Sequence, residues 1–489
     1  MPFNSYPYFV FLAVAVLGFR LLEKGAPTGR RVFLLLASYA FYAWWRADFL
    51  LLLCGSTLVN YALGCEIERR RMQHKDRRAI LWAGLAFNLG LIATFKYDTL
   101  FVSTANDVLG LGLPVPHFFL PLAISFFTFE QISYLVDADA GKTHNYGLLD
   151  YALFVAYFPH LIAGPIVRHN DLIPQFRQLR SKNDDLAAGI TLFTIGLAKK
   201  SLIADNLAPF ADAIFNAAAR GTQLGATDSW LGTLFFAFQI YFDFSAYSDM
   251  ALGSSMMLGI RLPVNFHSPY KAASIIEFWR RWHISLSAFL RDYLYVPLGG
   301  NRKGRERRYL NLFLTMLLGG LWHGANWTFM LWGGLHGLYL SVNHAFRHAT
   351  KGVKTPPGWR LPLHAASVML TFAATTLAWI VFRAPDLASA KNVLGGLIGG
   401  GHSAVVSFSP LATVALTLLV SIVWWMPNSM ELMWRFRPAL PSPYPDQPVE
   451  PARRLSWRPT PLQAGIYGLM CIVAVLALSN LKPFIYFQF

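Results

Sequence analysis

The sequence contains few charged residues. Asp, Glu, Lys and Arg make up 14% of its 489 residues, whereas a soluble globular chain carries roughly 25%. So few charges cannot cover the surface of a soluble body of this size, which excludes two or three soluble domains. Apolar residues make up 55% of the chain, and stretches of about 20 of them recur, each long enough to cross the hydrocarbon core of a bilayer. We therefore expect a single all-α integral-membrane domain over residues 1–489.

Acidic residues are scarcer than basic ones. The chain has 26 Asp and Glu against 42 Lys and Arg, which gives a formal net charge of +16. In a membrane protein such an excess reflects Lys and Arg in cytoplasmic loops, where they set the orientation. No nucleic-acid partner is expected, because no basic stretch outside the apolar segments is interleaved with aromatic residues. The lipid bilayer is the partner that the composition implies.

Cysteines are rare, and several common active-site motifs are missing. Cys54, Cys65 and Cys471 have no paired spacing, so the sequence predicts neither a disulfide framework nor a zinc site. It contains no P-loop, no Rossmann fingerprint and no Gly-x-Ser-x-Gly elbow. These absences disfavour an ATP-driven pump, a dinucleotide enzyme and a serine hydrolase. We expect no metal and no bound cofactor.

The chain alternates between apolar segments and short loops, six of which are basic. By the positive-inside rule the basic loops belong in the cytoplasm. Counting crossings between them indicates about 12 transmembrane helices, with both termini on the side opposite the cytoplasm. The basic loops lie at residues 20–31, 66–78, 168–182, 301–308, 347–360 and 435–458, and the apolar segments at about 7–22, 31–45, 49–63, 79–95, 118–136, 150–167, 187–207, 229–253, 310–325, 327–345, 364–382, 409–427 and 462–480.

One apolar segment, residues 150–167, cannot cross the membrane once, because it follows one basic loop and leads into another. It also contains Pro159, Gly164 and Pro165, which interrupt a helix. Non-helical backbone at membrane depth is tolerated where it is buried in protein. The segment is therefore predicted to be a re-entrant hairpin.

Residues 262–309 differ from the rest of the chain in carrying many charges. Between residues 274 and 291, apolar residues recur near helical spacing, which predicts an amphipathic helix in the cytoplasmic interface or packed under the bundle. The apolar positions are Ile275, Trp279, Trp282, Leu286 and Phe289, and the polar residues between them are Glu277, Arg280, Arg281, Ser287 and Arg291.

Histidines in or beside apolar segments are the first candidates for chemistry, because ionisable groups are costly there. His323 has Gly320 and Gly324 close by, which let backbone or substrate approach, and a neutral imidazole can accept a proton as a general base. A structural histidine bonded to a backbone carbonyl fits the same position. His336, among small residues, fits helix packing as well as function. His283 lies on the amphipathic segment, and this position suits a histidine at the membrane interface.

Buried acids are the second group of candidates. Asp243 and Asp249 lie in an apolar segment among hydroxyl residues, and Glu130 lies in another. They can orient a histidine or bind a polar ligand, but structural hydrogen bonding is the explanation that their positions favour. Acids along interrupted spans also fit a protein of another class, a transporter of polysaccharide or ions.

Several long motifs together resemble the membrane-bound O-acyltransferase family. They occur in order over nearly the whole chain, and they are most similar to the bacterial branch that contains the alginate O-acetylation membrane protein. The matching residues are 158–165 (FPHLIAGP), 241–249 (YFDFSAYSD), 278–286 (FWRRWHISL), 292–300 (DYLYVPLGG), 319–327 (GGLWHGANW) and 483–489 (PFIYFQF).

This resemblance implies a ring of tilted helices around a central tunnel, with the active histidine deep inside. The family's near-invariant histidine falls on His323. A second family position, His or Asn on an amphipathic segment, falls on His283, and His336 matches a further one. The resemblance also implies acetyl-CoA as the acyl donor from the cytoplasm. It further implies a periplasmic acetyltransferase partner that modifies an exported polysaccharide, with alginate as the expected polymer and the bacterial inner membrane as the location.

The expected reaction is attack of an acceptor hydroxyl on a thioester. His323 is the predicted general base, and a covalent acyl-histidine intermediate stays open. The oxyanion needs hydrogen-bond donors, which Trp322, Asn326 or backbone N–H groups around Gly324 can supply. His283 is expected near the cytoplasmic mouth, where it positions the thioester or assists the leaving thiolate. The basic loop 302–308 can attract the anionic donor.

Other acyl transfers within the family fit the same motifs. They include D-alanylation of a cell-wall polymer and acetylation of exported cellulose or another glycan. The sequence does not distinguish these polymers.

Overall fold

In the computed structural model the regular secondary structure of the described residues is helical, with turns and loops between the helices and an isolated β-bridge between Pro263 and Leu440. The long helices are α1 (Tyr6–Leu21), α2 (Pro27–Ala43), α3 (Asp48–Met72), α4 (Arg78–Ile92), α6 (Ile124–Asp139), α10 (Asn183–Ala198), α11 (Asp205–Ala219), α12 (Ala226–Met257), α15 (Gly304–His323), α16 (Trp327–Ala349), α17 (Arg360–Arg383), α19 (Pro410–Trp425) and α21 (Pro461–Leu476). The structure describes residues 1–24, 26–116, 118–162, 164–399, 405, 410–444, 446, 449–452, 455–480, 482, 484 and 485.

Every predicted crossing has a helix in the structure, but not every helix is long. Within the described residues, four helical stretches are long and apolar enough to span a membrane, namely Asp48–Met72, Arg78–Leu109, Asn183–Ala219 and Pro357–Arg383. Several other helices are too short to be assigned as membrane-spanning from their length alone. The 16 residues of α1, for example, extend about 24 Å at 1.5 Å per residue, less than the hydrocarbon thickness of about 30 Å.

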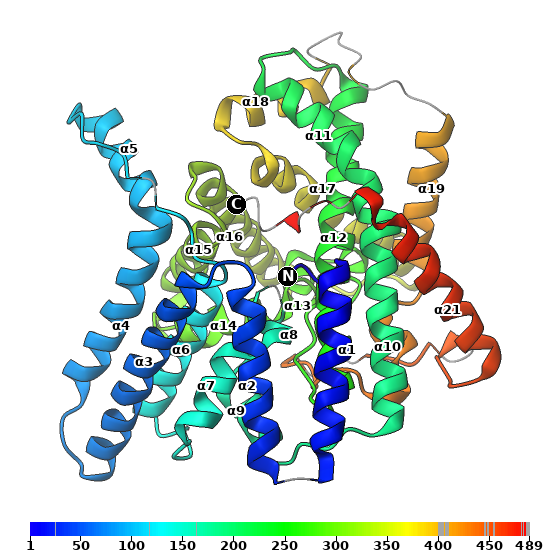
Figure 1. Cartoon of the computed structure of the whole chain (residues 1–489). Coiled ribbons are helices and arrows are strands. Elements are labelled where there is room, and N and C mark those ends of the chain that lie inside the picture. The colour runs from blue at the N-terminus through cyan, green and yellow to red at the C-terminus, as the bar shows by residue number, and fades with distance from the viewer. Residues whose placement is uncertain are drawn as a thin grey trace.

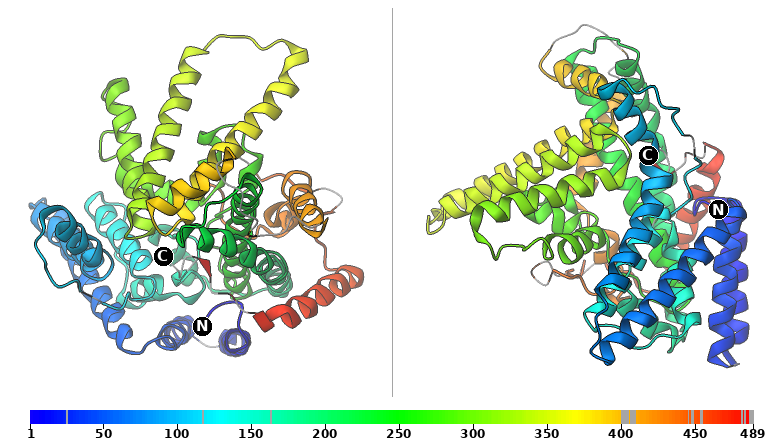
Figure 2. Two further views of the ribbon diagram at one scale, coloured as in Figure 1. Left: turned by 90° about the horizontal axis from the view of Figure 1, so that it is seen from above. Right: turned by 90° about the vertical axis from the view of Figure 1, so that its left-hand side faces the viewer.

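The helices are steeply inclined to one another. Figure 1 shows α1, α2, α3 and α4 running side by side, while α12 runs through the middle of the molecule. The two views in Figure 2 show α15, α16 and α17 extending sideways from this body. Helix α12 is buried along almost its whole length. The core therefore lies around α12. Helix α17 packs against both α12 and α16, and so connects the α15–α16 pair with this core.

Two buried acids on α12 are paired with lysines. Lys200 Nζ lies 2.7 Å from Asp243, and Lys199 Nζ lies 2.7 Å from Asp249. Both lysines lie on a π-helical turn, η3 (Lys199–Ala204), between α10 and α11. Pairing offsets the cost of removing these charges from water, so the two aspartates tie α12 to its neighbours.

The predicted hairpin at residues 150–167 folds back on itself. It consists of α7 (Leu148–Ala156) and the short α8 (Phe158–Leu161), with a break at Tyr157, and α9 (His169–Phe176) follows. Asp150, at its start, lies 3.1 Å from Arg177, beyond α9. The chain through α7, α8 and α9 thus returns close to its starting point, and the re-entrant placement of residues 150–167 in the membrane stays a prediction.

Cysteine labelling tests this topology. In a chain lacking Cys54, Cys65 and Cys471, we expect cysteines introduced at Gly147 and Arg177 to react only from the cytoplasmic side. A control cysteine at Gly110, after α5 (Asp98–Leu109), should react only from the opposite side. Reaction of Gly147→Cys and Arg177→Cys from different sides would exclude the hairpin and invert the orientation of every later helix.

The prediction of one amphipathic helix over residues 274–291 is wrong in detail. Two short helices occupy this segment, α13 (Ile275–Arg281) and α14 (Ile284–Leu290), and the chain breaks between them at Trp282 and His283. His283 has a φ of 43°, in the left-handed region that interrupts a right-handed helix. The break turns the apolar side chains of both helices inward, so they lie in the protein core rather than along a membrane surface.

Candidate active site

Helix α15 carries His323 into the protein interior. It begins at Gly304, within the basic stretch 301–308, and ends at His323, which is buried. A Cβ on Gly320 would lie 2.2 Å from the carbonyl oxygen of Phe329, and one on Gly324 would lie 2.2 Å from the Phe329 ring. These glycines therefore serve close packing of α15 against α16, and they do not leave open space for a substrate beside His323.

Aromatic rings connect His323 with the other two candidate histidines. The His323 ring centroid lies 5.0 Å from that of Trp322 and 5.1 Å from that of Trp332. Trp332 in turn lies 4.8 Å from His336, and Trp322 lies 6.2 Å from His283. Residues from α14, α15 and α16 thus bring together the three histidines that the sequence singles out.

His283 is held in a defined tautomer. Its Nδ1 lies 3.0 Å from Oδ1 of Asn265, and the same oxygen accepts a hydrogen bond from Ser285 Oγ at 3.0 Å. Since the amide oxygen only accepts, Nδ1 of His283 carries the proton. Burial lowers the pKa of His283 to about 3, so the ring is neutral at physiological pH. Its Nε2 is then a proton acceptor.

His336 has the opposite arrangement. The indole N–H of Trp279 points at Nδ1 of His336 over 3.3 Å. An indole nitrogen can only donate, so Nδ1 of His336 accepts and the neutral ring carries its proton on Nε2. His336 is therefore oriented as a hydrogen-bond donor, whereas His283 is oriented as an acceptor.

Several buried ring nitrogens of this cluster have no hydrogen-bond partner among the described residues. Buried polar groups are nearly always paired, so a group of unpaired ones indicates a site where a polar ligand binds. The atoms are Nε1 of Trp322, Trp332 and Trp379 and Nε2 of His283 and His336.

A cavity of about 190 Å³ reaches His323 from one side. His323, Trp322 and Lys96 line it, together with Ser125 and residues 120–124 before and at the start of α6. This cavity lies at the end of α15 that is remote from the basic loop 301–308. We call it the outer cavity.

A second cavity, of about 310 Å³, lies at the other end of α15. Arg280, Arg291 and Arg308 line it, and Trp279 forms its wall toward His336. Arg308 and His323 are 15 positions apart on one helix, which corresponds to about 22 Å. We call this the inner cavity; it lies at the basic end of α15.

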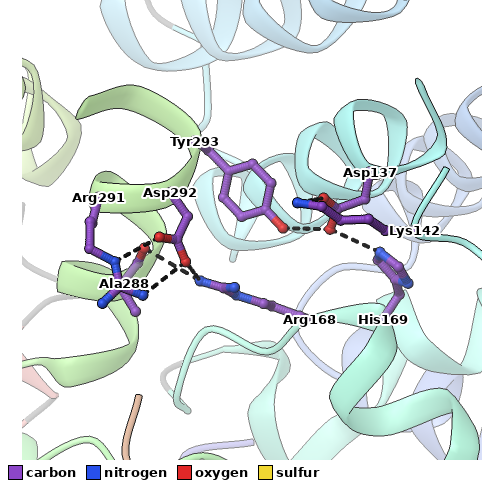
Figure 3. A network of polar contacts seen from close by, with 8 residues as sticks. All are labelled: Asp137, Lys142, Arg168, His169, Ala288, Arg291, Asp292 and Tyr293. Atoms are coloured by element: carbon purple, nitrogen blue, oxygen red, sulfur yellow. Dashed lines mark hydrogen bonds and ion pairs between the residues drawn. The ribbon is translucent and has the colours of Figure 1, made fainter. Parts of the chain in front are cut away.

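A polar network holds the segment that carries Arg291 (Figure 3). Asp292 accepts hydrogen bonds from Arg168 at 2.5 Å and from Arg291 at 2.6 Å. Burial acts to raise the pKa of Asp292, but these two arginines hold it below its usual value. Next to Asp292, Tyr293 donates to Asp137 at 2.6 Å. The network thereby fixes the wall of the inner cavity to α6 and to the chain just before α9.

The other predicted site residues form hydrogen bonds or ion pairs with residues outside the histidine cluster. Oδ1 of Asn326 caps α16 by accepting from Thr328 N at 3.0 Å, and its Nδ2 donates to Pro385 O at 2.8 Å. Besides its ion pair, Asp243 accepts from the backbone N–H of Ile485 at 2.8 Å. Glu130 pairs with His160 at 3.1 Å. Of the closing motif at 483–489, only Phe484 and Ile485 lie within the described residues.

Sequence reasoning missed Asn265 and Lys96. Asn265 is an uncharged residue in an irregular stretch, where no helical spacing marks it. Lys96 follows the predicted segment 79–95 and resembles an ordinary interfacial cation. A lysine on a π-helical turn is a signal for a functional position, but the turn is visible only in the structure.

His323 lines the outer cavity, and the inner cavity lies toward the other end of the same helix. This arrangement suits the transfer of a group between molecules that enter from different sides. The cations of the inner cavity suit an anionic donor, and the unpaired N–H groups suit a developing oxyanion. Fold and site together define the class as a helical membrane transferase.

The chain belongs to the membrane-bound O-acyltransferase family, whose model matches residues 41–380. It is 41% identical over 472 residues to a probable alginate O-acetylase of Pseudomonas putida, covering 94% of each chain. It is 46% identical over 379 residues to a probable alginate O-acetylase of Pseudomonas aeruginosa, covering 76% of this chain and 70% of the other. A peptidoglycan O-acetyltransferase of Helicobacter pylori is 43% identical over 421 residues, covering 80% of this chain and 78% of the other. The chain is thus an O-acyltransferase.

Proposed function

We propose that the chain takes an acetyl group from cytoplasmic acetyl-CoA and passes it across the membrane for O-acetylation of an exported polysaccharide. The polymer is alginate, and a periplasmic partner acetyltransferase completes the transfer. Relatives named for acetyl transfer to alginate support the acyl group and the acceptor. The observation that carries the proposal is that His323 lines the outer cavity, while the inner cavity toward the other end of α15 is lined by arginines.

The proposed chemistry follows from the groups around His323. The acceptor hydroxyl oxygen attacks the thioester carbonyl carbon, and His323 removes the hydroxyl proton as the bond forms. The indole N–H of Trp322, which has no partner among the described residues, donates to the oxyanion. The carbon–sulfur bond then breaks, and His323 returns the proton to the leaving thiolate.

The proposal includes the arrangement in the membrane. The long helices form a ring of about 12 crossings around the tunnel, with both termini in the periplasm of a bacterial inner membrane. Single-turnover transfer from labelled acetyl-CoA by purified protein tests the activity directly. Intact thioester after incubation with an acceptor would contradict the proposal.

Peptidoglycan is a second candidate acceptor, because the relative from Helicobacter pylori is named for it. The two acceptors contain different sugars, so the same labelled-donor assay in cells distinguishes them. Label in alginate supports the first candidate, and label in peptidoglycan supports the second.

The arginines of the inner cavity should determine affinity for the donor. We expect Arg308→Gln and Arg291→Gln each to raise KM for acetyl-CoA roughly tenfold with little change in kcat, because a hydrogen bond to a charged group contributes about 1.5 kcal/mol. Arg305→Gln is the matched control, since Arg305 lies in the same basic loop but is exposed. An equal rise for all three variants would indicate general attraction of the donor rather than a binding site.

A further inference from the structure

The last carbonyl groups of α15 are hydrogen-bonded in an unusual way. The last four carbonyl groups of a helix have no partner within the helix, and here they are buried in a membrane protein. Gly324, which follows α15, is extended with a φ of −164° and does not form a glycine cap. The carbonyl groups next to His323 must therefore be satisfied from elsewhere.

A neighbouring helix supplies the donors. Tyr97 donates its hydroxyl to Leu321 O at 2.8 Å. Lys96 donates to Trp322 O at 2.5 Å and to His323 O at 3.2 Å. Two consecutive residues thus bind three consecutive carbonyl oxygens at the end of the helix that carries His323.

The local backbone explains how two adjacent side chains reach one helix end. Lys96 and Tyr97 lie on η2 (Ala93–Tyr97), a π-helical turn between α4 and α5. A π turn inserts an extra residue into a helix, and such turns occur frequently at functional sites. A positive charge at a helix C-terminus also complements the helix dipole.

The lysine has no hydrogen left for a ligand. Its third contact is Ser125 Oγ, at 3.4 Å, so its donors are directed at protein atoms. Its ammonium also lies 5.8 Å from the centre of the Trp322 ring, the residue proposed to bind the oxyanion. Lys96 therefore contacts the backbone of His323 and the ring of Trp322 at once.

We propose that Lys96 and Tyr97 are positioning residues that hold the end of α15, and with it His323 and Trp322, in the geometry that acyl transfer requires. The inference rests on the proposed role of His323. In this proposal Lys96, which lines the outer cavity, holds the general base His323 in position and does not bind the acceptor. A misplacement of about 1 Å at a reacting group can lower a rate about 10²-fold.

Steady-state kinetics on purified protein test the proposal. We expect Lys96→Met to lower kcat by roughly 10- to 100-fold per folded molecule, with KM for acetyl-CoA within about twofold of the unaltered protein, because the inner cavity is untouched. Lys96→Arg, which keeps a cationic donor, should recover a large part of kcat. Tyr97→Phe, which removes only a hydroxyl, should lower kcat by a smaller factor.

Lys271→Met is the matched control. Lys271 also donates to a backbone carbonyl just after a helix, Met426 O at 3.0 Å, but it lies outside both cavities. We expect its kcat to equal that of the unaltered protein. If Lys96→Met yields too little folded protein, Tyr97→Phe decides the question, because a single hydroxyl seldom determines folding.

Unchanged kcat in both Lys96→Met and Tyr97→Phe would overturn the proposal. So would Lys96→Arg that is as impaired as Lys96→Met at equal abundance. His323→Ala in the same assay separates this inference from the proposed function. An inactive His323→Ala beside a fully active Lys96→Met refutes only the positioning role, whereas an active His323→Ala refutes the proposed function itself.

Discussion

Replacing His323 with alanine is expected to reduce acetyl transfer by roughly 10²-fold or more, the loss typical of a missing acid–base group. The alanine variant lacks any group that can accept the proton of the acceptor hydroxyl. Nearby histidines do not replace it, because His336 is oriented as a donor and His283 is anchored to Asn265. Transfer should be measured from labelled acetyl-CoA, with the amount of folded protein measured in parallel.

His323→Asn separates proton transfer from hydrogen bonding. Asparagine keeps a polar group next to Trp322, but its amide cannot accept the proton, so it should be as inactive as alanine. Because the His323 ring packs against Trp332 and Phe382, both variants lose packing, and activity must be compared per folded molecule. His348→Ala, at the exposed end of α16, is the control and should be fully active. Full activity in His323→Asn at equal abundance would return His323 to a structural role.

The sequence predicted the helices well because hydrophobic length and loop charge are local signals. The segment 310–325, for example, corresponds to α15, and the hairpin at 150–167 followed from the basic loops on both sides. The break at His283 was not predictable in this way. Helical spacing of apolar residues continues through residues 282 and 283, and no glycine marks the left-handed position there.

The candidate site was predictable only in part. His323 and His283 could be named from the family motifs, but their connection through Trp322 depends on how α14 and α15 pack. The glycines near His323 suggested an open site, and packing against α16 accounts for them instead. Lys96 acts on carbonyl groups 226 residues further along the chain, and no pattern within a single segment reveals such a contact.

Replacing His283 should have the second-largest effect, and different substitutions should give different results. We expect His283→Leu to lower acetyl transfer roughly 10²-fold, whereas His283→Asn should retain a measurable fraction of it. The backbone is one reason, because residue 283 has a φ of 43° and asparagine tolerates that conformation better than leucine. The side chain is the second reason, because an asparagine amide at position 283 can still donate to Asn265, as Nδ1 of His283 does.

The same pair of variants shows which nitrogen of His283 matters. Asparagine preserves the bond to Asn265 but cannot reach the position of Nε2, the buried atom without a partner among the described residues. If His283 mainly holds the break between α13 and α14, the asparagine variant keeps part of kcat and KM for acetyl-CoA changes little. If Nε2 takes part in the reaction, both variants fall to the same low kcat at normal abundance. That second result would contradict a positioning role and place His283 beside His323 as a catalytic residue.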